Sequence, residues 1–167
     1  MAWLARHIEY LALPAALGAA LMGGLLFAFS NFIMRALMQL PAALGMDAMQ
    51  RINVEILNPV FFAVFLGTST LCVVIIAASL RAGLSTAREL LLVGAICYLA
   101  GVLGVTAVFN VSLNNVLASL GPSAAAEHWP QYVTNWLRWN HVRTVLAVFS
   151  SALLMIGTCA ELAARRS

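Results

Sequence analysis

Residues 60–80 read VFFAVFLGTSTLCVVIIAASL, a run that contains no charged side chain. An α-helix rises about 1.5 Å per residue, so roughly 20 apolar residues cross a hydrocarbon core about 30 Å thick. Three other uncharged stretches follow the same rule: Leu11–Phe29, Leu90–Phe109 and Val145–Ala160. Backbone polar groups in lipid must be paired within their own segment, and the alternating pattern of a membrane β-barrel is missing from the sequence. We therefore expect four membrane-spanning helices.

The overall composition agrees with a lipid environment. The chain has 167 residues, of which 63% are hydrophobic and 9% charged, and its mean hydropathy is +0.95. Soluble domains carry about 25% charged residues, and a soluble fold this apolar would expose large sticky patches. The sequence therefore predicts an all-α fold, an integral membrane four-helix bundle in a single transmembrane domain over 1–167. The expected spans are about 11–35, 58–80, 88–109 and 142–163.

The first stretch also invites a second interpretation, as a cleaved signal peptide. It is longer than the 7–15 apolar residues of a signal h-region, which favours a membrane span. Four spans place both termini and the turn at 80–90 on one side, and two longer connections, 36–57 and 110–141, on the other. Five arginines lie on the first side and four on the second. By the positive-inside rule we expect cytoplasmic termini, extracytoplasmic longer connections and, as location, a bacterial inner membrane.

Local signals predict where helices begin and where they touch. Asn58-Pro59 is typical of an N-cap followed by a first-turn proline, Thr86-x-x-Glu89 of a capping box, and Asp47-x-x-Gln50 of the cap of a short helix. The three cysteines are expected to pack as buried thiols. Small residues in the spans are expected to let helices approach closely; they include Gly23, Gly24, Gly67, Gly101, Gly104 and Gly157.

Polar side chains gather where the longer connections meet the spans. Residues three or four apart share a helix face, as Asn31 and Arg35 do, or Asn110 and Asn114. Each residue has a plain structural explanation: tryptophans form interfacial belts, arginines reach toward the interface, and asparagines cap helices. Many asparagines at one membrane boundary are costly unless their amides are paired, which indicates a hydrogen-bond network, a polar pocket, or both. The candidates are Asn31, Arg35, Gln50, Asn53, Asn110, Asn114, Trp136, Trp139, Asn140, His141 and Arg143.

Several of these motifs, taken in order, resemble one known family. The run 27–37, Asn58-Pro59, Phe109-Asn110-Val-Ser-Leu-Asn114 and Trp136-Leu-Arg-Trp139-Asn140-His141-Val-Arg143-Thr144 are similar to the anthrone oxygenase-like family. Its members are small four-span membrane proteins, most of which have no assigned function in bacteria. The family commonly has proline where this chain has Ser112, which alters a turn.

The resemblance implies the oxidation of a lipophilic, electron-rich aromatic, anthrone- or quinol-like, by molecular oxygen without a cofactor. Such chemistry needs a base for a ring proton and donors for the resulting oxyanion. His141 is the expected base and Arg143 the second catalytic residue, with Asn110, Asn114 and Asn140 as donors. Trp136 and Trp139 are expected to stack on a flat ring. Asn31, Arg35, Gln50 and Asn53 complete the expected substrate-binding set.

Two other interpretations compete with the enzyme. A copper or zinc ion at His128 and His141 lacks a third ligand, so we expect no metal. A non-catalytic membrane protein could instead bind a small lipophilic molecule or act as a transporter or complex subunit, and four spans would then call for a homo-oligomer. The lipid bilayer is the expected partner. Nucleic acid is not, because no basic stripe with interleaved aromatics is present.

Overall fold

The computed structural model describes residues 7–83 and 85–165 and contains helices and no strand within these ranges. The first leg consists of α2 (Glu9–Ala28), the π-helix η1 (Phe29–Ile33) and α3 (Met34–Met38), and the second of α4 (Ala42–Glu55) and α5 (Pro59–Ala82). The third leg consists of α6 (Thr86–Cys97), the π-helices η2 (Tyr98–Gly104) and η3 (Thr106–Asn110), and α7 (Val111–Ala118). The fourth consists of the 3₁₀ turn η4 (Pro122–Ala124) and α8 (Ala125–Ala164).

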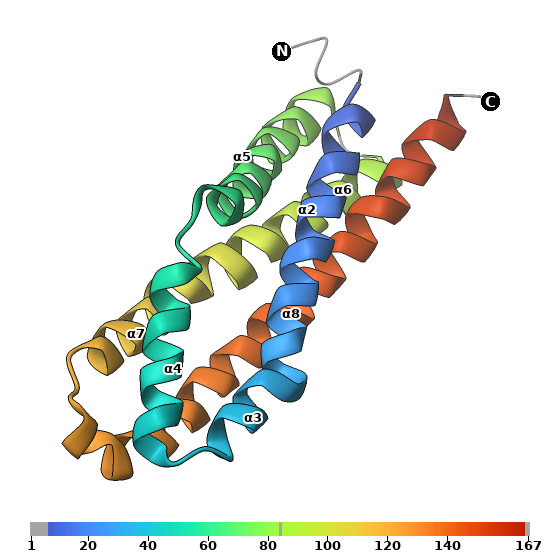
Figure 1. The fold of residues 1–167 in the computed structure, drawn as a ribbon. Helices are drawn as coiled ribbons and strands as arrows, with labels where there is room; N and C mark the ends of the chain where they lie inside the picture. Colours follow the sequence, from blue (N-terminus) through green and yellow to red (C-terminus); the bar gives the residue numbers. More distant parts are fainter. Residues whose placement is uncertain (1–6, 84, 166–167) are drawn as a thin grey trace.

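Four helical stretches are long and apolar enough to cross a membrane: Glu9–Met38, Pro59–Ala82, Thr86–Ala118 and Pro122–Ala164. This confirms the predicted all-α membrane fold. The described ends of the chain, the last turn of α5 and the first turn of α6 lie at one end of the molecule, and α3, α4 and α7 lie at the other (Figure 1). We call these the terminal end and the cap end.

The cap end is more helical than the sequence indicated. The connection expected at 36–57 folds largely into α4, and the connection expected at 110–141 folds into α7 and the first part of α8. α8 has 40 residues and is therefore about 60 Å long, twice the thickness of a hydrocarbon core. Its first half packs with the cap helices around a second hydrophobic cluster that includes Met46, Met49 and Trp129.

Small residues hold the central helices close together, as predicted, but not at every glycine. A Cβ on Gly157 of α8 would lie 3.0 Å from the Ala87 carbonyl oxygen of α6, so that contact depends on glycine. Gly24 and Gly67 have no atom within 4 Å of the position that a Cβ would take. The prediction that these two glycines mediate helix contacts is therefore wrong.

Helix starts follow the sequence in part. Asn58 caps α5, and its Oδ1 accepts a hydrogen bond from the Phe61 backbone N–H at 3.0 Å. α6 is capped by Ser85 rather than by the predicted Thr86. Asp47 and Gln50 lie inside α4, so they cap no helix.

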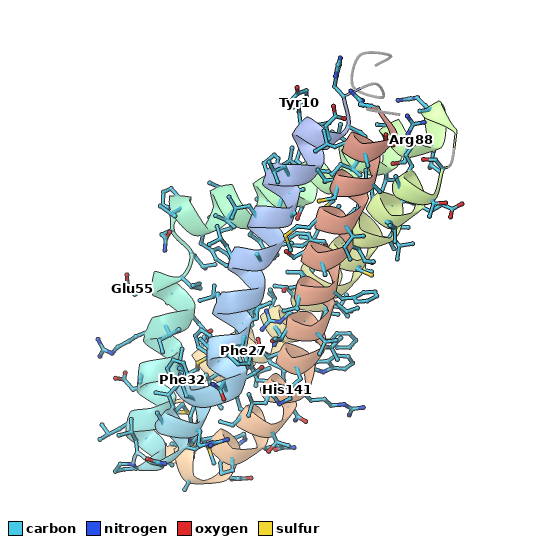
Figure 2. All side chains as sticks on the ribbon, turned by 90° about the vertical axis from the view of Figure 1, so that its right-hand side faces the viewer. Tyr10, Phe27, Phe32, Glu55, Arg88 and His141 are labelled. Atoms are coloured by element: carbon cyan, nitrogen blue, oxygen red, sulfur yellow. The ribbon has the colours of Figure 1, made fainter. Side chains whose placement is uncertain are left out.

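Two ion pairs that were not predicted from the sequence connect helices at the terminal end. Glu9 of α2 pairs with Arg165 at 2.8 Å, and Glu161 of α8 pairs with Arg88 of α6 at 2.8 Å; Arg88 lies at this end of the bundle (Figure 2). Both carboxylates are buried. Of the three cysteines, Cys72 is buried as expected, whereas Cys159 is exposed.

Candidate functional site

A cavity of about 370 Å³ lies between the membrane bundle and the cap. Helices α2, α4, α5, α7 and α8 and the π-helices η1 and η3 all contribute to its walls. One wall is apolar and includes Met22, Phe61 and Phe65. The other carries seven polar side chains: Gln50, Asn53, Thr106, Asn110, Asn114, Asn115 and Arg143. A cavity of this size with convergent polar groups is the usual form of a small-molecule site.

Arg143 is the cationic residue of this cavity, and its surroundings are unusual. Its side chain is buried, with 7% of its surface exposed. Nη1 donates to Thr106 Oγ1 at 3.1 Å, and Nη2 donates to Asn140 Oδ1 at 2.7 Å. Among the described residues no carboxylate forms an ion pair with it, and Nε has no hydrogen-bond partner. A buried charge without a counter-ion is costly, which points to a ligand as the missing partner.

Asn110 supplies a second unpaired group beside the same cavity. Its Nδ2 donates to the Trp136 carbonyl oxygen at 3.5 Å, while its buried Oδ1 has no partner among the described residues. Asn110 ends the π-helix η3, which begins at Thr106. π-helical turns are rare and concentrate at functional sites. This turn places both Thr106 and Asn110 on the cavity wall.

Asn114 orients two aromatic residues at the cap end of the cavity. Its Oδ1 accepts hydrogen bonds from the Tyr132 hydroxyl at 2.9 Å and from Trp136 Nε1 at 3.0 Å. Asn53 reaches the same Tyr132 hydroxyl at 3.5 Å. The Trp136 ring is thereby fixed against Phe29, with ring centroids 5.4 Å apart. The predicted amide network is present, and it borders a pocket.

Gln50 links two cap helices across the cavity. Its Nε2 donates to the Leu117 carbonyl oxygen at 2.7 Å and to that of Leu120 at 3.1 Å. Because both hydrogens of the amide are used on α7 and the residues after it, Gln50 fixes the width of the cavity between α4 and α7.

The remaining predicted site residues lie outside the cavity. Asn31 and Arg35 are exposed. Trp139 stacks on Phe109 with ring centroids 3.6 Å apart, and Asn140 is fully buried behind Arg143. His141 is exposed on the flank where α2 and α8 pass each other (Figure 2). An imidazole in that position cannot take a proton directly from a ligand in the cavity.

The cavity has a rim at the bend between α4 and α5. Exposed residues of this rim are Val54 and Leu57 before the bend, Phe62 after it, and Val111, Asn115 and Ala118 on the facing helix α7. All of them except Asn115 are apolar. The rim therefore offers a mainly apolar entrance near the level at which α5 begins.

Comparison with known proteins gives one family. A family model described as anthrone oxygenase matches residues 59–153, more than half of the chain. The chain belongs to the anthrone oxygenase family. The matched region contains Thr106, Asn110, Asn114, Asn115 and Arg143, most of the polar wall. No curated protein and no solved structure matches the chain.

In this anthrone oxygenase family member, the two histidines considered as metal ligands lie far apart. His128 and His141 lie 13 positions apart on the continuous helix α8, about 20 Å along its axis, so they cannot share one metal ion. Within the described residues, no three His, Cys, Asp or Glu side chains gather as a metal site would require. Met22, Phe61, Phe65 and Thr106 line the cavity and were not predicted, although Thr106 stands one turn before Asn110.

Proposed function

We propose that this member of the anthrone oxygenase family binds a lipophilic, electron-rich aromatic molecule in the cavity and oxidises it with molecular oxygen. One observation carries the proposal: Arg143 and Asn110 line the polar wall of an otherwise apolar cavity, and within the part of the chain that the structure describes Arg143 Nε and Asn110 Oδ1 are a buried donor and a buried acceptor without hydrogen-bond partners. Leaving such groups unpaired costs free energy. A carbonyl or enolate oxygen of a ligand would supply an acceptor for Arg143, and a ligand hydroxyl would supply a donor for Asn110 Oδ1. The aromatic and aliphatic wall would hold the ring system.

The chemistry would resemble the oxidation of an anthrone to an anthraquinone. The ring CH₂ loses a proton to form an enolate, which gives one electron to O₂ and then combines with the superoxide to a hydroperoxide. Loss of water leaves the new carbonyl, so one anthrone and one O₂ yield one anthraquinone and one H₂O. An enolate transfers an electron to O₂ directly, so the proposed reaction includes no metal or organic cofactor.

The role of Arg143 in this scheme is to stabilise the enolate oxygen. Charge-assisted hydrogen bonds are about twice as strong as neutral ones, and they strengthen as the carbonyl oxygen becomes negative. Among the cavity-lining residues, no His, Asp or Glu is present, so the proton would pass to water. Asn110, Asn114, Asn53, Gln50 and Trp136 would then orient the ligand.

A substrate of this kind dissolves in lipid, which explains why the site would be built on membrane helices. The rim residues Leu57, Phe62 and Val111 would admit it sideways from the bilayer. We further propose that the terminal end faces the cytoplasm of a bacterial inner membrane, on the weak excess of arginines at that end. The chain alone encloses the cavity, so an oligomer is not needed for the reaction.

Isotope labelling tests the reaction. The purified protein in lipid nanodiscs would be given anthrone under ¹⁸O₂, with the protein-free mixture as the background. We expect anthraquinone that carries one ¹⁸O atom in its new carbonyl, formed faster than in the background. Product formation at the background rate would contradict the proposed activity.

The competing function is binding without turnover, and one observation favours it: the lining of the cavity offers no carboxylate or imidazole base. A carrier or sensor of lipophilic aromatics would need the polar wall but not the chemistry. Saturable anthraquinone binding combined with no ¹⁸O incorporation would select this alternative.

A further inference from the structure

A chain of hydrogen bonds joins Arg143, in the cavity, to His141, on the outside of the bundle. Arg143 Nη2 donates to Asn140 Oδ1 at 2.7 Å. Asn140 Nδ2 contacts Ser30 Oγ at 2.8 Å, and Ser30 Oγ lies 3.0 Å from His141 Nδ1. The chain crosses from α8 to the π-helix η1 and returns to α8.

The donors and acceptors available on each side chain determine the direction of most hydrogen bonds in this series. A guanidinium can only donate, so the Asn140 oxygen must face Arg143 and the Asn140 nitrogen must face away. That nitrogen has two hydrogens, and both are used: one on the Leu26 carbonyl oxygen at 2.8 Å and one on Ser30 Oγ. Ser30 is therefore an acceptor toward Asn140 and keeps one hydrogen to donate.

The Ser30 hydrogen has two acceptors within reach. One is His141 Nδ1, and the other is Thr144 Oγ1 at 3.3 Å; Thr144 uses its own hydrogen on the Asn140 carbonyl oxygen at 2.8 Å. A neutral imidazole can accept from Ser30. A protonated imidazole can only donate, and it would turn the Ser30 hydrogen to Thr144. Protonation of His141 therefore leaves only the arrangement in which Ser30 donates to Thr144.

We propose that Asn140 and Ser30 are positioning residues for the Arg143 guanidinium and that protonation of His141 acts on Arg143 through them. This inference rests on the proposed role of Arg143 in ligand binding and names the regulation of that site. Hydrogen bonds in a chain polarise one another, so a change at the outer end alters the hydrogen bond at the inner end. The charged side chains on the segments beside His141 are Arg138 on α8 and Arg35 on α3, both exposed.

The hydrogen-bond chain from Arg143 to His141 also explains why a fully buried asparagine lies in the middle of α8. Asn140 is 0% exposed, and an amide buried in this way is costly unless all its groups are paired. Its oxygen and both of its hydrogens have partners on three different residues. Asn140 therefore joins α2, η1 and the cavity arginine in one network.

Nuclear magnetic resonance of ¹⁵N-arginine-labelled protein in nanodiscs tests the coupling without any ligand. The Arg143 side-chain signal would be assigned by its loss in Arg143→Lys. We expect this signal to move between pH 8 and pH 5, the range in which histidine side chains titrate. The movement should vanish in Ser30→Ala and in His141→Phe and persist in Ser30→Thr, which keeps the hydroxyl. A signal that ignores pH in the unmodified chain, or titrates unchanged in Ser30→Ala, would overturn the proposal.

Ligand affinity supplies a second readout with a matched control. Ser30→Ala should weaken anthraquinone binding roughly three- to tenfold, the effect of one lost hydrogen bond. Ser112→Ala removes an exposed hydroxyl that bonds within its own helix and should leave the affinity unchanged. If the unmodified chain binds no anthraquinone, the proposed function fails, and the resonance experiment still decides on the coupling.

Discussion

The guanidinium carbon of Arg143 lies 5.2 Å from the centroid of the Trp136 ring. An indole face attracts a cation, and the attraction grows when water is excluded. Among the described residues this ring takes the place that a carboxylate would hold in an ion pair. Because the ring does not neutralise the charge, Arg143 keeps its capacity to stabilise a negative oxygen on a ligand.

Replacing this arginine should separate function from stability. In Arg143→Met we expect the affinity for anthraquinone to fall about 10- to 100-fold, since a charged hydrogen bond contributes about 1.5–3 kcal/mol. The unfolding temperature should change little, because removing a buried charge offsets the cost of leaving Asn140 Oδ1 without its donor. Fluorescence titration and thermal unfolding in nanodiscs measure the two effects.

The matched control is Arg138→Met, on the same helix. Arg138 is exposed, and its guanidinium lies over Trp139, 5.5 Å from that ring centroid and outside the cavity. This variant should bind anthraquinone like the unmodified chain. Equal losses of affinity in both variants would show that the effect of Arg143 is not local to the cavity.

Access through the apolar rim predicts a second result. Ala118→Trp places a large ring at the edge of the cavity on α7, and the association rate of anthraquinone should fall at least about tenfold because the entrance narrows. Val116 is exposed on the same helix and does not line the cavity, so Val116→Trp should bind at the normal rate. Stopped-flow fluorescence distinguishes the two. Unchanged association in Ala118→Trp would place the entrance elsewhere.

Close packing at Gly157 predicts a third result. A methyl group there would lie 3.0 Å from the Ala87 carbonyl oxygen, and overpacking of this kind typically costs about 1–3 kcal/mol. Gly157→Ala should therefore lower the unfolding temperature. Gly24→Ala, in open space on α2, should leave it unchanged or raise it, since alanine favours a helix. The opposite order of the two variants would refute the packing of α6 against α8.

The ion pair at the terminal end predicts a fourth result. Glu161→Gln removes the negative charge that lies 2.8 Å from Arg88 Nε. Leaving the partly buried guanidinium unpaired should destabilise the fold by roughly 1–3 kcal/mol. Asp47→Asn breaks the exposed pair with Arg51 on α4 and should have no measurable effect on thermal unfolding. An unchanged unfolding temperature in Glu161→Gln would mean that the ion pair contributes little to the stability of the fold.

Apolar length and the absence of charges were enough to predict the four spans. The polar residues where the longer connections meet the spans indicated the end of the molecule at which the cavity lies. Helical spacing also placed Asn110 and Asn114 together on the cavity wall. These features depend on local sequence alone. The regular geometry of one helix carries them into the structure.

Which face of a helix meets the cavity could not be predicted in the same way. Asn31 and Arg35 have suitable spacing, but both are exposed, Asn31 within the π-helix η1 and Arg35 in α3 after it. His141 and Arg143 are two positions apart on α8, so only one of them can face the cavity. The choice between them depends on how α8 packs against its neighbours, and the packing of distant segments leaves no local signal. The same holds for Glu161 and Arg88, which are distant in sequence and close in space.

The central claim is that the cavity recognises an oxygen atom on a flat ring system through Arg143. The most direct measurement compares the affinities of anthraquinone and anthracene, which have the same ring frame with and without carbonyl oxygens, for the unmodified chain and for Arg143→Met. We expect the unmodified chain to bind anthraquinone at least about tenfold more tightly, and the variant to lose this preference. Equal affinity of the unmodified chain for the two compounds would contradict the account.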